Sequence, residues 1–410
     1  MNISVNELAN TSTANLPREI EIFLAKRVLQ EEDNKDLAVQ SFQDKLGKLS
    51  VNTHKNVVTE TAAIFAELRN TGYAMPPKQL RQVLDKNWGL GWQKQFKSFD
   101  VRPIAAASIG QVHRAKLKTG QDVAIKVQFP NMRRTIDGDV STLITMVKTF
   151  GVAPENLDID HYASLARDQL IAETDYLQEA DNLRQFAQYF AGDARYRVPK
   201  VYDDLSTTDV LVMSLENGVP LETTRDWSAD QQKRIGQDLV DLVLREVFEF
   251  KHVQTDPNLA NYLIDPDTHQ LILLDFGACV RISKTSLNVY QTLLNAGITL
   301  EPERMKRIFV DYNLLPPELN AAEDAFVDQV LNTVMAELAA TDMFSLAQSR
   351  VFDLLDLNDV KLYTALLPHE NLPVDLIFTQ RKIIGLVLFL RSLGASLPVM
   401  QMLKVYENRS

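Results

Sequence analysis

The feature that most constrains this chain is a lysine in the middle of an alternating, β-branched segment. Residues 122–128 read D-V-A-I-K-V-Q, and Pro130 follows them. The alternation and the β-branched residues predict a strand that ends before the proline. A lysine buried in such a strand is unfavourable unless it meets an anion. Lys126 therefore indicates an anion-binding site on a sheet, with an exposed lysine on an edge strand as the alternative.

The segment before this strand has the order of a nucleotide-binding loop. The kinase pattern G-x-G-x-x-G-x-V would read Ala105-x-Ala107-x-x-Gly110-x-Val112 here, so two of its glycines are alanines. A loop, a strand and a lysine in that order predict an ATP phosphate clamp. Alanine does not readily adopt a positive φ, and its methyl group blocks the closest backbone approach. We therefore expect this loop to contact phosphates differently from a glycine-rich loop.

Two motifs further along offer oxygen ligands for a divalent cation. Asp256 and Asn261 have the D-x4-N spacing of a kinase catalytic loop, and the apolar run 271–274 leads into Asp275 of an Asp-Phe-Gly. Mg²⁺ prefers oxygen ligands, so Asn261 and Asp275 are predicted to hold it. Asp256 is predicted to position or deprotonate the attacking group. Asp-Phe-Gly alone occurs by chance, but the complete ordered set of motifs is specific.

Two more segments complete the expected nucleotide site. Residues 165–190 have the periodicity of one long amphipathic helix with an acidic segment. Residues 209–218 read as a strand that runs into a glycine turn, which is the position of a kinase hinge. Met213 would back the adenine pocket, and backbone groups around Leu215 would meet the base. A routine core strand is the alternative.

Together these motifs resemble one known group, the UbiB (AarF/ADCK-like) family of atypical kinase-like proteins. Residues 105–113 read A-A-A-S-I-G-Q-V-H and are similar to that family's alanine-rich signature. The resemblance extends over about residues 42–395 and implies a protein-kinase-like fold that binds ATP or ADP with Mg²⁺. The positions implied to contact the nucleotide are Ala105, Ala106, Ala107, Ser108, Gly110, Val112, Lys126, Met213 and Leu215.

A second stretch resembles the acidic motif of the same family. Residues 173–182 read E-T-D-Y-L-Q-E-A-D-N, similar to an ExD motif followed by the glutamate that pairs with the strand lysine. The resemblance implies that Glu179 fixes Lys126, and that Glu173 and Asp175 form a family-specific regulatory pair. An ordinary solvated acidic face is the alternative.

Three short segments refine the resemblance. Residues 254–258, Q-T-D-P-N, are similar to the branch that serves coenzyme Q synthesis, and residues 380–385, Q-R-K-I-I-G, resemble a helical segment of that branch. The family's KxGQ motif would fall on K-L-G-K, with Lys45 in place and Lys48 where the glutamine should be. A donor-only cation thus replaces an amide. We expect Lys48 near Glu173, Asp175 or phosphate, unless K-L-G-K is plain helix surface.

Composition and charge limit the class of protein. The net charge of −11 argues against a nucleic-acid-binding protein, which would need a basic face. A single cysteine, Cys279, excludes an internal disulfide and suits a reducing cytoplasm. The six histidines have no metal-ligand spacing, and we interpret His113 and His252 as structural residues that hold loops.

The ends of the chain bear on its location. The first 18 residues lack the basic start and apolar core of a secretory signal, and Glu7 argues against a mitochondrial transit peptide. The apolar run at 383–390 is too short to cross a bilayer as a helix. We therefore expect a bacterial, cytoplasmic protein without a transmembrane helix, with peripheral membrane contact left open because the family is linked to lipid precursors.

Four regions are predicted along the chain. They are a loosely ordered leader at 1–35, a helical N-terminal extension at 36–98, a kinase-like N-lobe at 99–215 and a mostly helical, kinase-like C-lobe at 216–410. Trp88, Trp92 and Phe96 are expected to pack the extension onto the N-lobe. The predicted fold class is α+β, a bilobal protein-kinase-like fold. No Ala-Pro-Glu follows Asp-Phe-Gly, which argues against peptide recognition.

The resemblance implies a function as well as a fold. It predicts an Mg-dependent ATPase that supports ubiquinone (isoprenoid quinone) biosynthesis, with isoprenoid lipids or quinone-biosynthesis enzymes as partners. A small-molecule or lipid phosphotransferase is one alternative. A nucleotide-gated scaffold that organises lipid-modifying enzymes is another.

Overall fold

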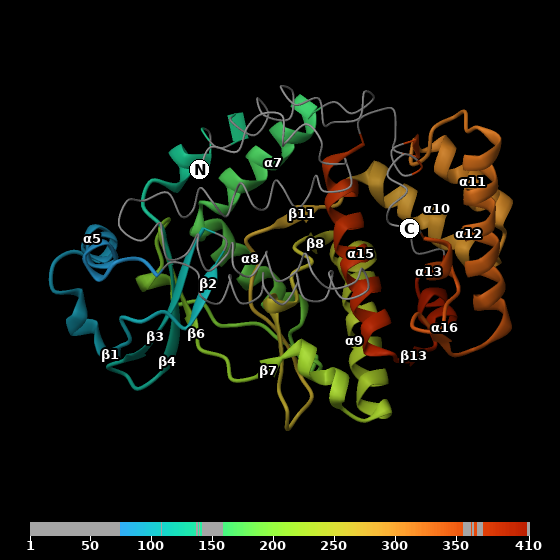
Figure 1. Cartoon of the computed structure of the whole chain (residues 1–410). Coiled ribbons are helices and arrows are strands. Elements are labelled where there is room, and N and C mark those ends of the chain that lie inside the picture. The colour runs from blue at the N-terminus through green and yellow to red at the C-terminus, as the bar shows by residue number, and fades with distance from the viewer. Residues whose placement is uncertain are drawn as a thin grey trace, which may run out of the picture. The chain divides into compact units, whose positions relative to one another are not determined.

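The structure is a computed structural model. It describes residues 74–141 apart from 108, 137 and 139, residues 159–355, residues 362, 365 and 366, and residues 372–407 (Figure 1). The predicted leader, Lys45, Lys48 and Ser108 lie outside the described residues. By their internal contacts the residues divide into two compact units. The sheet unit combines Met1–Ala153 with Tyr202–Ser214, and the helical unit combines Pro154–Val201 with Leu215–Ser410.

An antiparallel sheet forms the centre of the sheet unit. Its strand order is β1-β3-β4-β6, and β2 pairs with the other end of β3. The strand predicted at residues 122–128 is confirmed as β4, and the segment of the expected phosphate loop forms the β2–β3 hairpin. The elements are α5 (Pro77–Trp88), a short 3₁₀ helix (Trp92–Gln95), β1 (Phe96–Phe99), β2 (Ala105–Ala107), β3 (Gly110–Leu117), β4 (Asp122–Gln128) and β6 (Val210–Ser214).

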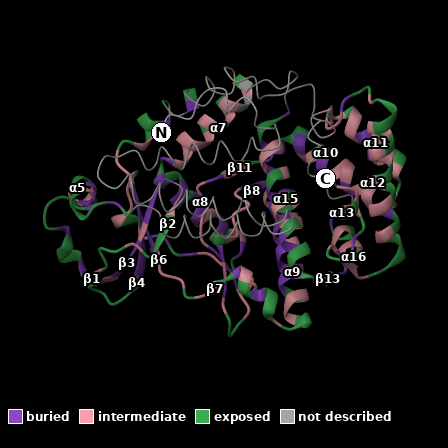
Figure 2. Ribbon diagram, viewed as in Figure 1, coloured by how far each residue is buried: buried purple, intermediate pink, exposed green. Residues whose placement is uncertain are grey.

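One face of this sheet carries the apolar core. Successive strand residues point to opposite faces, and here Val123, Ile125 and Val127 of β4 join one cluster with apolar residues of α5. Trp92 and Phe96 belong to the same cluster, and Trp88 packs against it, as predicted. Figure 2 shows the central strands as buried. Burial of each Val or Ile side chain contributes about 1.5–3 kcal/mol, so this face fixes the register of β4.

The helical unit contains most of the helices. It also holds a four-stranded sheet of order β5-β10-β9-β7 and two-stranded pairs β8–β11 and β12–β13. Its helices are α7 (Ile159–Glu173), α8 (Tyr176–Tyr189), α9 (Ala229–Arg245), α10 (Lys284–Thr299), α11 (Pro302–Asp311), α12 (Ala321–Ala340), α13 (Val351–Leu354), α15 (Val374–Leu393) and α16 (Val399–Lys404). Its strands are β5 (Tyr196–Arg197), β7 (Val219–Pro220), β8 (His252–Gln254), β9 (Tyr262–Ile264), β10 (Leu271–Leu273), β11 (Cys279–Arg281), β12 (Phe344–Ser345) and β13 (Ser396–Leu397).

The single long helix predicted over residues 165–190 is wrong. The chain instead forms α7, which ends at Glu173, and α8, which begins at Tyr176. Asp175 lies between them with extended backbone angles, and its side chain accepts a hydrogen bond from the backbone N–H of Leu177 at 3.0 Å. An aspartate at a helix N-cap satisfies an otherwise unpaired N–H, which favours a new helix start over a continuous helix.

Crossing a bilayer requires a helix of about 20 mostly apolar residues. None of the described helices is both long enough and apolar enough to cross a membrane.

Candidate active site

Asp256 is held by two hydrogen bonds within the loop between β8 and β9. The side-chain amide of Asn261 donates from Nδ2 to one carboxylate oxygen at 2.7 Å, and the backbone N–H of Asn258 donates to the other at 3.2 Å. Because the Asn261 nitrogen is occupied by Asp256, its oxygen Oδ1 is the atom left to act as a ligand. The pairing therefore orients an aspartate and an amide oxygen together.

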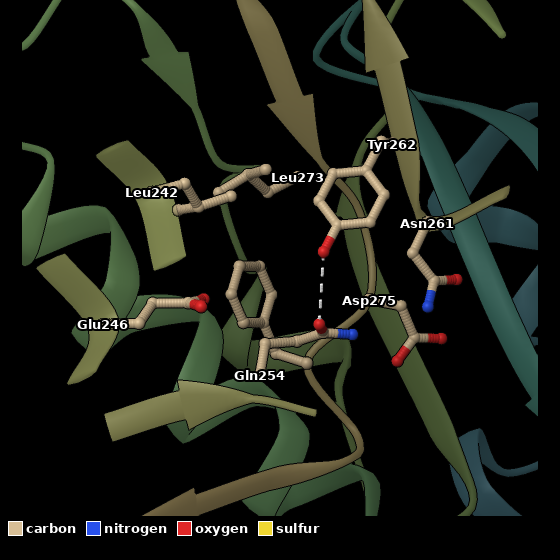
Figure 3. Close-up of a pocket in the computed structure, with 8 residues that line it drawn as sticks. Leu242, Glu246, Gln254, Asn261, Tyr262, Leu273 and Asp275 are labelled. Carbon is tan, nitrogen blue, oxygen red and sulfur yellow. Dashed lines mark hydrogen bonds between the residues drawn. The ribbon is translucent and has the colours of Figure 1, made fainter. Parts of the chain in front are cut away.

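Backbone pairing brings Asp275 to the same place. Strands β9 and β10 pair with Leu273 opposite Tyr262, and the N–H of Leu274 donates to the carbonyl of Asn261 at 2.9 Å. Asp275 thus follows directly beside Asn261, as Figure 3 shows. One oxygen of Asp275 accepts the N–H of Gly277 at 2.9 Å, which fixes its rotamer. The structure unites the two residues that the sequence predicted as metal ligands.

Two acidic side chains from α7 and α8 also reach this place. A β-carbon added at Gly277 would lie 3.3 Å from Asp275 Oδ1, 3.5 Å from Glu179 Oε2 and 3.8 Å from Glu173 Cγ. Glu179 is 2% exposed. Asn182, one turn beyond Glu179 on α8, donates to the carbonyl of Phe276 at 2.9 Å and ties the helix to the Asp-Phe-Gly segment. Carboxylates gathered this closely are stabilised by cations.

The available ligands suit a magnesium ion that shares its shell with phosphates. Among the described residues, no three His, Cys, Asp or Glu side chains form a metal site by themselves. Asn261 and Asp275 offer one amide oxygen and one carboxylate. Mg²⁺ is commonly bound by one or two protein oxygens, with waters and substrate phosphates completing its octahedron. The donor set therefore fits Mg²⁺ with a nucleotide better than a metal held by protein alone.

In the sheet unit, Lys126 lies on the face opposite the apolar core. Strand β4 runs between β3 and β6, so the alternative of an exposed lysine on an edge strand is wrong. The side chain is 4% exposed. Pairing places Ala105 opposite Val112, Val112 opposite Lys126, and Lys126 opposite Leu211. Directly paired residues share a face, so these four form one row across the sheet.

The pairing register shows which of the other predicted nucleotide contacts share the face of Lys126. Ala107 and Met213 lie two residues from members of this row on their own strands, so both share its face, whereas Ala106 pairs with Gln111 and belongs to the opposite face. Gly110 pairs with Ala107. Leu215 belongs to the helical unit. Leu211 was not among the predicted contacts. Its position two residues before Met213 on the same strand could have placed it on the same face.

Not every predicted contact is tested by these arrangements. Lys126 and Glu179 belong to different units, so their pairing remains a prediction. Asp175 caps α8, which is a structural use of a residue that was predicted as regulatory. His113 does hold a loop, since its ring contacts the carbonyl oxygen of Asp100 at 2.9 Å and stacks on Phe99.

His252 behaves differently from His113. Its ring lies 4.9 Å from that of Phe186, and its Nδ1 has no hydrogen-bond partner among the described residues. Burial, with a smaller effect of Arg281, lowers the pKa of His252 to about 4. The imidazole is therefore neutral at physiological pH, and His252 acts as an aromatic core residue.

A buried polar cluster lies behind the predicted metal ligands. A cavity of about 10 Å³ is lined by Glu246 and Gln254 on one side and by Asn261 and Asp275 on the other (Figure 3). It has room for about one water molecule and is far too small for a nucleotide. Lys382 of α15 donates to Glu246. Burial opposes the charge of Lys382, but the Glu246 carboxylate raises its pKa, and burial also raises the pKa of Glu246.

Comparisons with known proteins find relatives among atypical kinases. A family model described as the ABC1 atypical kinase-like domain matches residues 67–309. The chain is 35% identical over 289 residues to the mitochondrial atypical kinase COQ8B of Rattus norvegicus, covering 70% of this chain and 55% of that protein. It is 31% identical over 333 residues to the mitochondrial atypical kinase COQ8 of Saccharomyces cerevisiae, covering 81% and 66%.

These alignments differ in extent from the structural comparison. The chain spans about half the length of the mitochondrial atypical kinases COQ8B of Danio rerio and Rattus norvegicus, 46% and 55% respectively. Among solved structures, the complex of Rv3197 with erythromycin from Mycobacterium tuberculosis has a TM-score of 0.64 at 20% identity, covering 95% of this chain and 97% of that one. At that identity the similarity concerns the fold, which is α+β and protein-kinase-like.

Proposed function

Because the chain belongs to the ABC1 atypical kinase-like family, we propose that it binds adenine nucleotide with Mg²⁺ and hydrolyses ATP in support of ubiquinone biosynthesis. The observation that carries this proposal is the joint arrangement of Asp256, Asn261 and Asp275. An aspartate oriented by two hydrogen bonds, beside an amide oxygen and a carboxylate, is what phosphoryl transfer requires of a catalytic loop. The link to quinone synthesis depends on the resemblance of residues 254–258 to that branch of the family.

Each residue has a distinct role in the proposed reaction. When bound, Mg²⁺ would neutralise negative charge on the phosphate oxygens. Asn261 and Asp275 would hold the ion, and Lys126 would hold the phosphates with its ammonium group fixed by Glu179. Asp256 would accept a hydrogen bond from the attacking water, and this would aim a lone pair of the water oxygen at the terminal phosphorus. The apolar members of the row that contains Lys126 would form a wall against the adenine base, since ligand sites are mostly apolar.

The short segment after Asp-Phe-Gly supports a small acceptor. Strand β11 begins at Cys279 and pairs with β8, and α10 begins at Lys284. Protein kinases carry a long activation segment here, which binds the substrate peptide. This chain has no room for such a segment before α10, which favours water or a small molecule as the phosphoryl acceptor. A lipid or small-molecule phosphotransferase is therefore the second candidate, and it uses the same catalytic residues.

The test is steady-state phosphate release from Mg-ATP by the purified chain. It should be measured with and without phospholipid vesicles and compared with Asp275→Asn, which keeps the side-chain size but removes the metal-binding charge. Turnover that is lost in the variant supports the ATPase, and stimulation by vesicles supports peripheral membrane contact. Transfer of label from ATP to an added isoprenoid phenol or alcohol, in place of phosphate release, would favour the phosphotransferase.

One outcome would overturn both enzymatic candidates. If the chain binds Mg-ATP but neither releases phosphate nor labels an acceptor above the Asp275→Asn level, catalysis is excluded. Capture of a partner protein only in the presence of nucleotide would then favour a nucleotide-gated scaffold.

A further inference from the structure

Helix α15 contacts the catalytic loop although more than a hundred residues separate them in sequence. Its residues Arg381, Lys382 and Gly385 lie within about one helical turn of one another. Arg381 and Lys382 contact Thr255 and Glu246, which precede Asp256, and Gly385 approaches Pro257, which follows it. These residues belong to the Q-R-K-I-I-G stretch, whose role the proposed reaction leaves unexplained. All three contacts lie within the helical unit.

The closest approach is at Gly385. A β-carbon added there would lie 2.5 Å from Cβ of Pro257 and 3.5 Å from its Cα. Pro257 follows Asp256 directly and is rigid, because its ring fixes φ. It therefore cannot yield as the tip of a flexible side chain would. The glycine allows the helix backbone to lie directly against the loop at the residue next to the catalytic aspartate.

One turn earlier on α15, Lys382 pairs with Glu246, which begins the segment that leads to the catalytic loop. The two side chains are 4% and 1% exposed. Glu246 begins a π-helical turn, Glu246–Phe250, that ends at Lys251 with a φ of 52° and leads into β8. The backbone N–H of Gln254 also donates to the Glu246 carboxylate. One ion pair thus ties α15 both to the end of α9 and to the strand that precedes Asp256.

Thr255 is held from two directions. Arg381 donates to its carbonyl oxygen at 3.5 Å, a long hydrogen bond. Its own N–H and hydroxyl both donate to the carbonyl of Ala278, at 2.8 and 3.0 Å. Ala278 follows the Asp-Phe-Gly segment directly. The residue before Asp256 is therefore fixed to α15 on one side and to the segment that carries Asp275 on the other.

We propose that Lys382 and Gly385 are positioning residues, through which α15 sets the place of Asp256 and Asn261 relative to Asp275. The inference rests on the proposed function of these three residues. Among the described residues, Lys382 pairs with Glu246 and Gly385 lies against Pro257, so each acts through the backbone of the loop. Replacing a buried ion pair with apolar residues is often neutral or stabilising, so stability alone gives little reason for such a pair. Its geometry instead fixes one register of helix and loop.

The first experiment compares Gly385→Ala with Gly297→Ala. Both glycines lie inside helices, but the nearest atom to an added β-carbon at Gly297 is the flexible methyl of Met305, at 3.6 Å. Gly297→Ala should leave turnover unchanged. Gly385→Ala should displace Pro257, lower kcat for phosphate release by about a hundredfold and leave KM for ATP within about threefold, because misplacement of about 1 Å has that effect on the chemical step.

The second experiment addresses Lys382 and includes a rescue. Lys382→Met should reduce kcat, and Lys382→Arg should restore most of it, since the guanidinium can still pair with Glu246. Hydrogen exchange of residues 252–261 is measured in every variant. It should accelerate at least tenfold in Gly385→Ala and Lys382→Met, and not in Gly297→Ala or Lys382→Arg. A Lys382→Met/Glu246→Leu double variant serves if Lys382→Met does not fold, and it should also show rapid exchange of the loop.

The outcomes separate this inference from the proposed function. If the unaltered chain neither binds nor turns over Mg-ATP, the proposed function has failed, and hydrogen exchange still decides whether α15 fixes the loop. If the unaltered chain is active and Gly385→Ala matches Gly297→Ala in kcat and in loop exchange, the positioning role is overturned. A fall in melting temperature with unchanged kcat would equally reduce Lys382 to a stabilising residue.

Discussion

Two lysines, one in each unit, are equally buried but lie in opposite settings. Lys126 on β4 and Lys382 on α15 are both 4% exposed. Lys382 meets the carboxylate of Glu246, in its own unit. The residues paired directly with Lys126 are Val112 and Leu211, neither of which is acidic. A buried lysine requires an anion. The proposed partners of Lys126 are Glu179 and phosphate, whereas Lys382 pairs with Glu246.

This difference separates a structural lysine from a ligand-binding one. The Lys382 pair is bonded to a helix end and to a strand, so its protein partner fixes the backbone. The row around Lys126 is small and apolar, with Ala105 at its end. An apolar wall with one cation suits a flat base joined to phosphates. We therefore expect substitution of Lys126 to affect activity most, and substitution of Lys382 to affect stability most.

The largest expected effect is that of Lys126→Met on activity. The variant keeps an unbranched apolar stem but loses the charge that would hold the phosphates. We expect kcat/KM for phosphate release to fall at least about a thousandfold, because phosphoryl transfer relies on electrostatic stabilisation. The free energy of unfolding, measured by urea denaturation, should fall less than it does in Lys382→Met. A large loss of stability with normal activity would reverse the roles assigned to the two lysines.

Lys382→Met should have the next largest effect, on stability. Removing one partner leaves the Glu246 charge buried without compensation, so the free energy of unfolding should fall by about 3–5 kcal/mol. The double variant Lys382→Met/Glu246→Leu should recover most of that loss, because no buried charge remains. Urea denaturation of both single variants and the double variant gives the coupling energy. Additive losses would mean that the two residues do not act as a pair.

The pH dependence of stability offers a third test, at His252. Its folded pKa of about 4 lies below the ordinary value of 6.5. The unfolded chain therefore binds this proton more readily, and stability should fall as pH decreases from about 6.5 to 4. The shift corresponds to about 3 kcal/mol.

His252→Phe removes that titration and suits the aromatic surroundings of Phe186 and Tyr189. Burial raises the pKa of Asp238 to about 6, so this carboxyl makes stability rise as pH falls. It does so equally in the unaltered chain and in His252→Phe. The difference between the two stability profiles therefore isolates His252. Profiles that stay parallel from pH 7 to pH 4 would contradict the burial of a neutral imidazole.

The smallest expected effect is that of Asp175→Ala. Loss of the N-cap of α8 should reduce the free energy of unfolding by about 1 kcal/mol. Asp175→Ser retains a capping oxygen but removes the charge, so it should restore stability. If Asp175→Ser is stable yet alters the rate of ATP turnover, the aspartate has the regulatory role that the resemblance implied, in addition to the cap.

The local motifs were more predictable from the sequence than the long-range contacts. Strand β4 was predicted at the correct residues because alternation and β-branching are local properties. The helix over 165–190 was wrong because apolar periodicity continues through Asp175, whereas the cap interrupts the backbone. The ion pair of Lys382 with Glu246 joins residues 136 positions apart, which no local pattern reveals. Periodicity gives the faces of elements, and it does not give their partners.

The most direct test of the magnesium–nucleotide site is calorimetric titration of the chain with ADP, with Mg²⁺ and with EDTA. Asn261 and Asp275 should make binding depend on the metal. We predict tight binding with Mg²⁺, and binding at least about tenfold weaker in EDTA or in Asp275→Asn. Equal affinities for the unaltered chain and Asp275→Asn, with or without Mg²⁺, would contradict the site built from Asp256, Asn261 and Asp275.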